Sequence, residues 1–162
     1  MFQSNAAVDG RQRTLCDDLR RVRDHADSAA VITCCGDTLT HLDSKSEIEQ
    51  LVIDVFHSLK SGGKAIFSFR DYSNALTGHA RFIPVKSDEN RILTCVLDYL
   101  PESVTVTDLL HVRTGNTWTQ SVSSYQKVRL SSDDFVDMVT RAGFVVEVST
   151  VVNRLITVIA VK

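Results

Sequence analysis

The feature that most constrains the fold is a strand–helix–strand unit in residues 29–69. Residues 29–35 form a continuous apolar run that ends at Gly36. A run of this kind is typical of a strand that is buried on both faces of a parallel sheet. Residues 64–69 form a second apolar run of strand length. A helix between two such strands predicts a right-handed crossover in an α/β sheet.

The segment between these two strands has the pattern of an amphipathic helix. Ser44 and Glu47 have the spacing of a capping box at its start, and Gly62-Gly63 marks its end. Apolar residues recur three and four positions apart and form one helical stripe: Ile48, Leu51, Val52, Val55, Phe56 and Leu59.

The middle of the chain has a different pattern, which predicts an antiparallel meander. Three long β-rich runs are separated by short turns: residues 91–100, 103–112 and 117–130. We expect His111 and Tyr125 on the surface of this meander. The preceding residues, 71–90, are expected to form a loop of about 20 residues, a length that is often functional.

The last part of the chain predicts a second crossover. Ser131 or Ser132 begins a helix that Gly143 ends, and its apolar residues are Phe135, Met138, Val139 and Ala142. Strands are expected at about 144–151 and 154–161. Because only a short turn joins them, the last strand should run antiparallel to the others.

Several of these pieces resemble the S-adenosylmethionine-dependent methyltransferases that act on small molecules. They are the run Val31-Ile32-Thr33-Cys34-Cys35-Gly36 with His41-Leu42 after it, the turn Leu59-Lys60-Ser61-Gly62-Gly63-Lys64, and Arg141-Ala142-Gly143-Phe144 before the last two strands. The resemblance covers roughly residues 14–70 and 130–162, the C-terminal two-thirds of the family's domain. It implies an α/β fold: an incomplete Rossmann-like sheet with helices on its faces, an antiparallel last strand and an inserted antiparallel β-meander.

The resemblance also implies a set of residues that contact the cofactor, S-adenosylmethionine. In the family, a carboxylate after the third strand accepts from the adenine amino group, and the next backbone N–H meets a ring nitrogen. Asp18 and Leu19 occupy these positions, while Cys35 and Gly36 would face the methionine part. The alternative is structural: Asp17 and Asp18 cap a helix that runs through Leu19.

The chain departs from the family in one important respect. The family's GxGxG loop precedes the segment around Asp18, and the chain has too few residues there to hold it. The acidic residue that holds the ribose hydroxyls is missing as well. We therefore expect a methyltransferase-like protein that is truncated and inactive as this chain alone. The alternative is a non-catalytic binding or scaffold module that retains the back half of the fold.

Candidate residues for the methyl acceptor follow the two crossover strands, at the edge where open α/β sheets bind ligands. His41 is a candidate base, although capping or packing is the plainer role. Arg70, Tyr72 and Arg81 could shape a pocket for an acidic acceptor near Gly36. The alternative for the two arginines is ion pairing within the loop, which contributes little at a surface.

Charge and composition argue against several other classes of protein. The chain has 18 basic and 20 acidic residues, a balance that favours neither nucleic acid nor an anionic membrane. Its histidines and four cysteines lack the spacing of a metal site. Unpaired cysteines and the lack of a signal sequence predict a cytoplasmic protein. The expected partner is a small-molecule acceptor, with no nucleic acid and no membrane.

The expected organisation is a single domain in residues 7–162, because no linker or repeat divides the chain. Residues 1–6 resemble the remnant of a cleavable expression tag. In the family's sheet order, the strand at 29–35 would lie beside the missing first strand. Its edge would therefore be bare, and a bare apolar edge invites pairing with another chain. We expect a homodimer built around this edge or the apolar face beside it.

Overall fold

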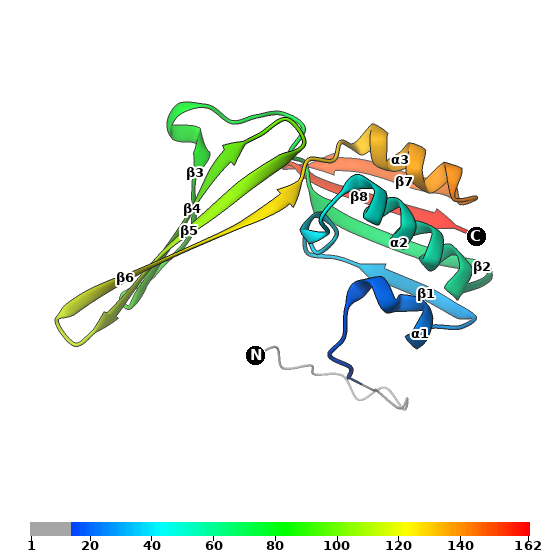
Figure 1. Cartoon of the computed structure of the whole chain (residues 1–162), viewed down its shortest axis with the longest axis horizontal. Coiled ribbons are helices and arrows are strands. Elements are labelled where there is room, and N and C mark those ends of the chain that lie inside the picture. Colours follow the sequence, from blue (N-terminus) through cyan, green and yellow to red (C-terminus); the bar gives the residue numbers. More distant parts are fainter. Residues whose placement is uncertain (1–13) are drawn as a thin grey trace.

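The computed structural model describes residues 14–162 and contains two four-stranded sheets (Figure 1). The interpretation of residues 1–6 as a tag remnant concerns residues outside this range. One sheet carries the helices. The other projects from it as a long ribbon, inserted in the chain between β2 and α3.

The first sheet has the order β1-β2-β8-β7. Its strands are β1 (Ala29–Cys34), β2 (Leu59–Arg70), β7 (Val145–Val152) and β8 (Leu155–Val161). β1 and β2 are parallel, and β8 is antiparallel to both of its neighbours, β2 and β7. The predicted antiparallel last strand is therefore confirmed.

The described helices form one layer on one face of this sheet (Figure 1). They are α1 (Val22–His25), α2 (Lys45–Ser58) and α3 (Ser132–Arg141), with three-residue 3-10 helices at Leu19–Arg21 (η1) and Leu39–His41 (η2). A four-residue 3-10 helix, Gly78–Arg81 (η3), lies outside this layer and contacts β4 (Arg91–Tyr99) of the second sheet. The Oγ atoms of Ser44 and Ser131 accept from backbone N–H groups at the starts of α2 and α3. The apolar stripes of both helices are buried against β2 and β8, as their spacing predicts.

The opposite face of the same sheet carries exposed apolar side chains. The strand register places these residues on the side away from the helices: Val31, Val145, Val148, Val152 and Leu155, which are 37% to 69% exposed. Along the outer side of β1, the described residues supply no pairing strand. We call this side of the sheet, together with the outer edge of β1, the open face.

The turn that resembles a family motif is a bulge at the start of β2 rather than a turn before it. Ala29 pairs with Leu59, and the next paired residue of β1, Val31, lies opposite Lys64. Gly63 lies inside this bulge, where an added Cβ would be 2.9 Å from the carbonyl oxygens of Ala29 and Lys60. The close approach of two backbones explains why glycine occupies this position.

The second sheet is an antiparallel meander in the order β3-β4-β5-β6. Its strands are β3 (Phe82–Ser87), β4 (Arg91–Tyr99), β5 (Ser103–Thr114) and β6 (Thr117–Val128). The three predicted runs are confirmed as β4, β5 and β6. The expectation that residues 71–90 form a loop is wrong for residues 82–87, which form β3. β3 is an edge strand, where Pro84 is tolerated because proline cannot donate to a ladder. Its register shifts between Pro84 and Lys86.

Candidate functional site

The two sheets meet at Asp37, which follows β1 in a left-handed backbone conformation with φ of 70°. Its carboxylate accepts hydrogen bonds from the backbone N–H of Arg70 at 2.9 Å, the hydroxyl of Thr40 at 2.8 Å and the hydroxyl of Tyr72 at 2.9 Å. A fourth donor, the ammonium of Lys127, comes from β6 of the other sheet. Asp37 therefore connects β1, β2 and the meander.

The ion pair between Asp37 and Lys127 is almost completely buried. The two side chains are 13% and 8% exposed. The Lys127 Nζ also lies 5.7 Å from the ring centres of both Tyr72 and Tyr125, which is within range of a cation–π interaction. Burial and the charge of Asp37 raise the pKa of Tyr72, so this phenol stays protonated and donates to the carboxylate.

A cavity of about 220 Å³ opens beside this pair, between the edge of the first sheet and the inner face of the meander. We call it the junction cavity. Its charged lining residues are Asp37, Arg70, Asp71, Lys127 and Arg154, and its other lining residues are mostly apolar or aromatic. Such a lining, with few polar groups around an apolar interior, is typical of a small-molecule site.

His41 lies behind one wall of the junction cavity. Its ring stacks on Tyr125 with 5.2 Å between ring centres and 28° between the planes. Tyr125 lines the junction cavity, whereas His41 lines a second cavity of about 210 Å³. Burial and the nearby Lys127 lower the pKa of His41 below its usual range, so its imidazole is neutral at pH 7. A neutral imidazole can accept a proton.

The second cavity brings Asp18 and Leu19 together with His41. We call it the adenine-side cavity, after the role that the family resemblance implies for Asp18. Its other lining residues come from η1, the segment after β1 and the start of α2: Arg20, Thr38, Leu42, Asp43 and Glu47. The stacked rings of His41 and Tyr125 thus have one cavity on each side.

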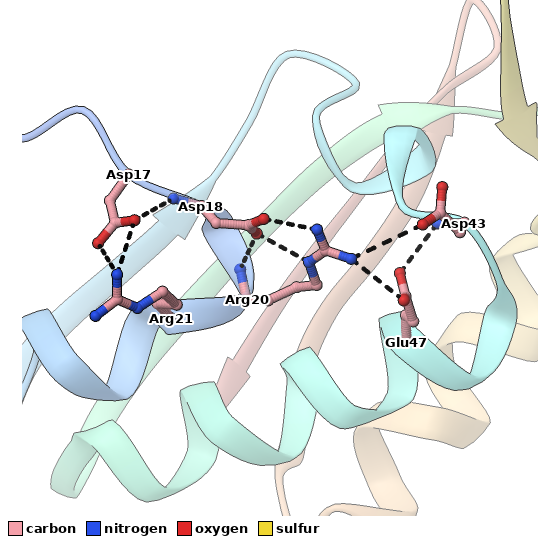
Figure 2. Close-up of polar contacts among 6 residues, drawn as sticks. All are labelled: Asp17, Asp18, Arg20, Arg21, Asp43 and Glu47. Atoms are coloured by element: carbon pink, nitrogen blue, oxygen red, sulfur yellow. Dashed lines mark hydrogen bonds and ion pairs between the residues drawn. The ribbon is translucent and has the colours of Figure 1, made fainter.

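The guanidinium of Arg20 forms an ion pair with the carboxylate of Asp18 (Figure 2). Its Nη2 lies 2.6 Å from Oδ2 of Asp18, and its Nε lies 3.0 Å from Oδ1. Its Nη1 reaches the carboxylates of Glu47 at 3.3 Å and Asp43 at 3.8 Å. Hydrogen bonds from Arg20 lower the pKa of Asp18 to about 2. Asp18 also caps η1 through the backbone N–H of Arg20, the structural role that the sequence left open.

Solved structures that resemble this chain include several methyltransferases. An S-adenosylmethionine-dependent methyltransferase from Clostridium acetobutylicum matches with a TM-score of 0.76 and 16% identity, over 93% of this chain and 65% of that one. An amino pentose methyltransferase from Micromonospora echinaspora, solved with S-adenosylmethionine bound, matches with a TM-score of 0.74 and 13% identity, over 90% and 62%. A sugar N-methyltransferase from Streptoalloteichus matches with a TM-score of 0.70 and 14% identity, over 90% and 60%.

The chain has part of a methyltransferase fold. It spans less than two thirds of the length of these methyltransferases. No family model and no curated protein sequence matches the chain. At these identities the likeness concerns the fold, and the roles of individual residues must be argued from their geometry.

Within this methyltransferase fold, the residues expected to hold the acceptor separate into two groups. Arg70 and Tyr72 line the junction cavity. Arg81 does not, because its guanidinium is paired with the Asp98 carboxylate and also donates to the carbonyl of Leu97. Its partner Asp98 lies in β4, outside the loop within which the sequence had suggested ion pairing.

Three further residues of the junction cavity were not identified from the sequence: Tyr125, Lys127 and Arg154. The expectation that Tyr125 lies on the meander surface is wrong, because its ring lines the cavity and stacks on His41. One feature of the sequence could have identified Lys127 as a residue of the cavity. It lies opposite Val104 in the strand register, so a charged residue is in phase with the apolar positions of the ribbon's inner face.

Cys35 and Gly36, the residues expected to face the methionine part of the cofactor, form the exit from β1. Gly36 has a φ of 78°, and its N–H donates to the hydroxyl of Ser68 at 3.3 Å. Cys35 is exposed, and its carbonyl accepts from the hydroxyl of Thr38 at 2.9 Å. Both residues lie close in the chain to Thr38 and His41 of the adenine-side cavity.

The described residues do not fit the whole of S-adenosylmethionine. Leu19 and His41 could border an adenine ring, but both oxygens of Asp18 are already bound by Arg20. Residues 14–162 contain no glycine-rich loop that would hold the amino-acid half. The adenine-side cavity can therefore accommodate one end of the cofactor at most.

Two other kinds of site have no support in the described part of the chain. Between residues 14 and 162, no group of three or more His, Cys, Asp or Glu side chains could hold a metal ion. In that same range, no helix is both long and apolar enough to cross a membrane.

Proposed function

We propose that this chain is the acceptor-binding portion of a small-molecule methyltransferase and is inactive by itself. The observation that carries the proposal is the pair of cavities on either side of the His41–Tyr125 stack. Asp18 and Leu19 border one cavity, and Arg70 and Tyr72 border the other. In this arrangement the methyl acceptor occupies the junction cavity, and the adenine of S-adenosylmethionine occupies the adenine-side cavity.

Methyl transfer mainly requires that the acceptor atom is aligned with the methyl group, sometimes with a base nearby. The volume of the junction cavity, about 220 Å³, restricts the acceptor to a small molecule or a small part of a larger one. The similar structures include methyltransferases of an amino pentose and of a sugar, which supports an acceptor of modest size. His41 does not line the junction cavity, so we propose that it packs on Tyr125, the plainer role that the sequence offered, rather than acts as the base.

Calorimetry with the cofactor tests this proposal. We expect S-adenosylmethionine to bind the chain with a dissociation constant no tighter than about 1 mM, which corresponds to about −4 kcal/mol. The reason is that Arg20 competes for Asp18 and no described loop holds the methionine part. Adenosine should bind about as well as the whole cofactor, because both would use only the adenine end.

Two variants make the calorimetric result specific. Asp18→Asn should abolish any adenosine binding that the chain shows, whereas Asp17→Asn, a matched change in a neighbouring paired carboxylate, should leave it unaltered. A micromolar dissociation constant for S-adenosylmethionine, about −8 kcal/mol, would mean that the chain completes the cofactor site by itself. That result would contradict the proposal that the chain is inactive by itself.

The alternative proposal is a non-catalytic binding or scaffold module, and the Arg20 network favours it. A carboxylate held between Nε and Nη2 of an arginine is already satisfied and gains little from an adenine amino group. Neither proposal expects methyl transfer by the chain alone, so the calorimetric titration with adenosine separates them. Adenosine binding that Asp18→Asn removes would eliminate the scaffold module, and no adenosine binding would favour it.

We further propose that two copies of the chain pair through the open face in the cytoplasm. The apolar strand β1 has an unpaired outer edge among the described residues, and edges of this kind pair readily with other strands. All four cysteines are free, which suits a reducing compartment.

Light scattering after size exclusion tests the homodimer. The expected mass is twice the 18.0 kDa of one chain. Val31→Lys places a charge on the open face and should give a monomer. Val122→Lys, at an exposed valine on the outer face of the meander, should leave the dimer intact. A monomer at high micromolar concentration of the unaltered chain would contradict the proposal.

A further inference from the structure

Arg154 occupies a backbone conformation that arginine rarely adopts. Asn153 and Arg154 form the two-residue turn between β7 and β8, with φ of 49° and 63°. Turns of this kind favour Asn-Gly, because both central residues need a positive φ. A side chain other than glycine in this conformation costs about 1 kcal/mol or more. The strain suggests that the guanidinium has a role that glycine could not fill.

Part of that role is to hold the segment after β2. Nη2 of Arg154 donates to the carbonyls of Asp71 at 3.0 Å and Asn74 at 2.7 Å. The backbone N–H of Asp71 donates to the carbonyl of Arg154 at 2.8 Å. Nε and Nη1 of Arg154 make no hydrogen bond with residues 14–162, and the residue lines the junction cavity. Three N–H donors therefore remain for a ligand.

Arg70 is a second arginine at the same cavity. It lies next to Arg154 in space, because its ladder partner is Leu155. Its backbone N–H bonds Asp37, but its side chain forms no hydrogen bond and no ion pair within residues 14–162. Two guanidinium groups thus meet at one cavity, and the part of the chain that the structure describes gives neither of them a carboxylate partner.

The other charged groups of the cavity already have hydrogen-bond partners. Lys127 is paired with Asp37. Oδ1 of Asp71 accepts from both the N–H and the hydroxyl of Ser73. The cavity carries three cationic and two acidic side chains, a net excess of one positive charge, and its two arginines have no ion-pair partner among the described residues. Its interior is apolar, with Leu76, Ile83, Leu97 and Val106 in the lining.

We infer that the junction cavity binds a small anionic molecule, whose carboxylate lies between Arg70 and Arg154 and whose apolar or aromatic body enters the cavity. Planar guanidinium groups bind carboxylates through paired, charge-assisted hydrogen bonds. The inference rests on the proposed function in one respect only: the bound molecule is taken to be the methyl acceptor. Arg81 has no part in the site, since it is already paired with Asp98.

The test compares benzoate with benzyl alcohol, a neutral molecule of similar size, by nuclear magnetic resonance titration of the whole chain. Benzoate is expected to bind at least about tenfold more tightly, because only benzoate can pair with the guanidinium groups. Arg70→Gln should remove most of that difference without disturbing the fold, since its side chain makes no hydrogen bond and no ion pair with residues 14–162. Arg70→Lys should restore part of it.

Two further variants complete the test. Arg154→Gly gives the preferred Asn-Gly turn and should also weaken benzoate binding by about tenfold. Arg81→Gln is the matched control and should change nothing. Equal binding of benzoate and benzyl alcohol, no binding of benzoate, or an equal effect of Arg81→Gln would each overturn the inference. Benzoate binding together with a failure of adenosine to bind would leave the anion site established and count only against the proposed function.

Discussion

Replacing Asp37 with alanine should lower the free energy of unfolding by about 3–5 kcal/mol, the usual cost of leaving a buried charge without its partner. Lys127 would remain in a site where its side chain is only 8% exposed. The hydroxyl of Tyr72 and the N–H of Arg70 would lose their acceptor as well. Urea unfolding followed by circular dichroism measures the change.

A double variant separates the cost of the orphaned charge from the value of the pair. Asp37→Ala combined with Lys127→Met removes both charges and should recover most of the loss, because buried ion pairs are often replaced by apolar residues at little cost. The double variant should be more stable than Asp37→Ala alone. If Asp37→Ala costs less than about 1 kcal/mol, as an exposed pair would, then the two sheets are not held together by this contact.

Phe135→Ala should cost about 3–5 kcal/mol, which is typical of a large aromatic residue removed from a core. Phe135 is fully buried in α3, and its ring meets those of Phe67 and Phe69 edge to face at 5.1 Å and 4.9 Å. The substitution removes both aromatic contacts and leaves a cavity between the helix layer and β2. The same urea unfolding measurement applies.

The control for this prediction is Phe82→Ala. Phe82 is 49% exposed in β3, so its loss should cost less than about 1 kcal/mol. Similar losses for the two variants would show that the helix layer packs loosely on the first sheet. A cost below about 1.5 kcal/mol for Phe135→Ala would lead to the same conclusion.

The sequence predicted the first sheet well because its signals are local. The apolar stripe of α2 has a helical period, and all of its members that the structure buries lie on the side that meets the sheet. The short link between the last two strands also dictated their antiparallel pairing. β3 was missed because Pro84 argues against a strand, and the structure tolerates it only at the edge of the sheet.

The candidate site was harder to predict because its key contacts join distant parts of the chain. Lys127 is 90 positions from Asp37, and no local pattern indicates that the meander folds back to that point. Arg70 and Tyr72 could be identified because they directly follow a crossover strand, where ligands often bind. Arg154 looked like an ordinary turn residue until its neighbours in space were known.

The position of β8 has a consequence for the order in which the two sheets can form while the chain is synthesised. β8 lies between β2 and β7, so β2 has no partner on that side until the last residues of the chain exist. Asp71, just after β2, precedes Arg154, just before β8, by 83 positions. At about 5–20 residues per second, a ribosome needs about 4–17 s to cover that distance. The meander can form during this interval from strands that follow one another directly, whereas the helix-bearing sheet can close only around the final strand.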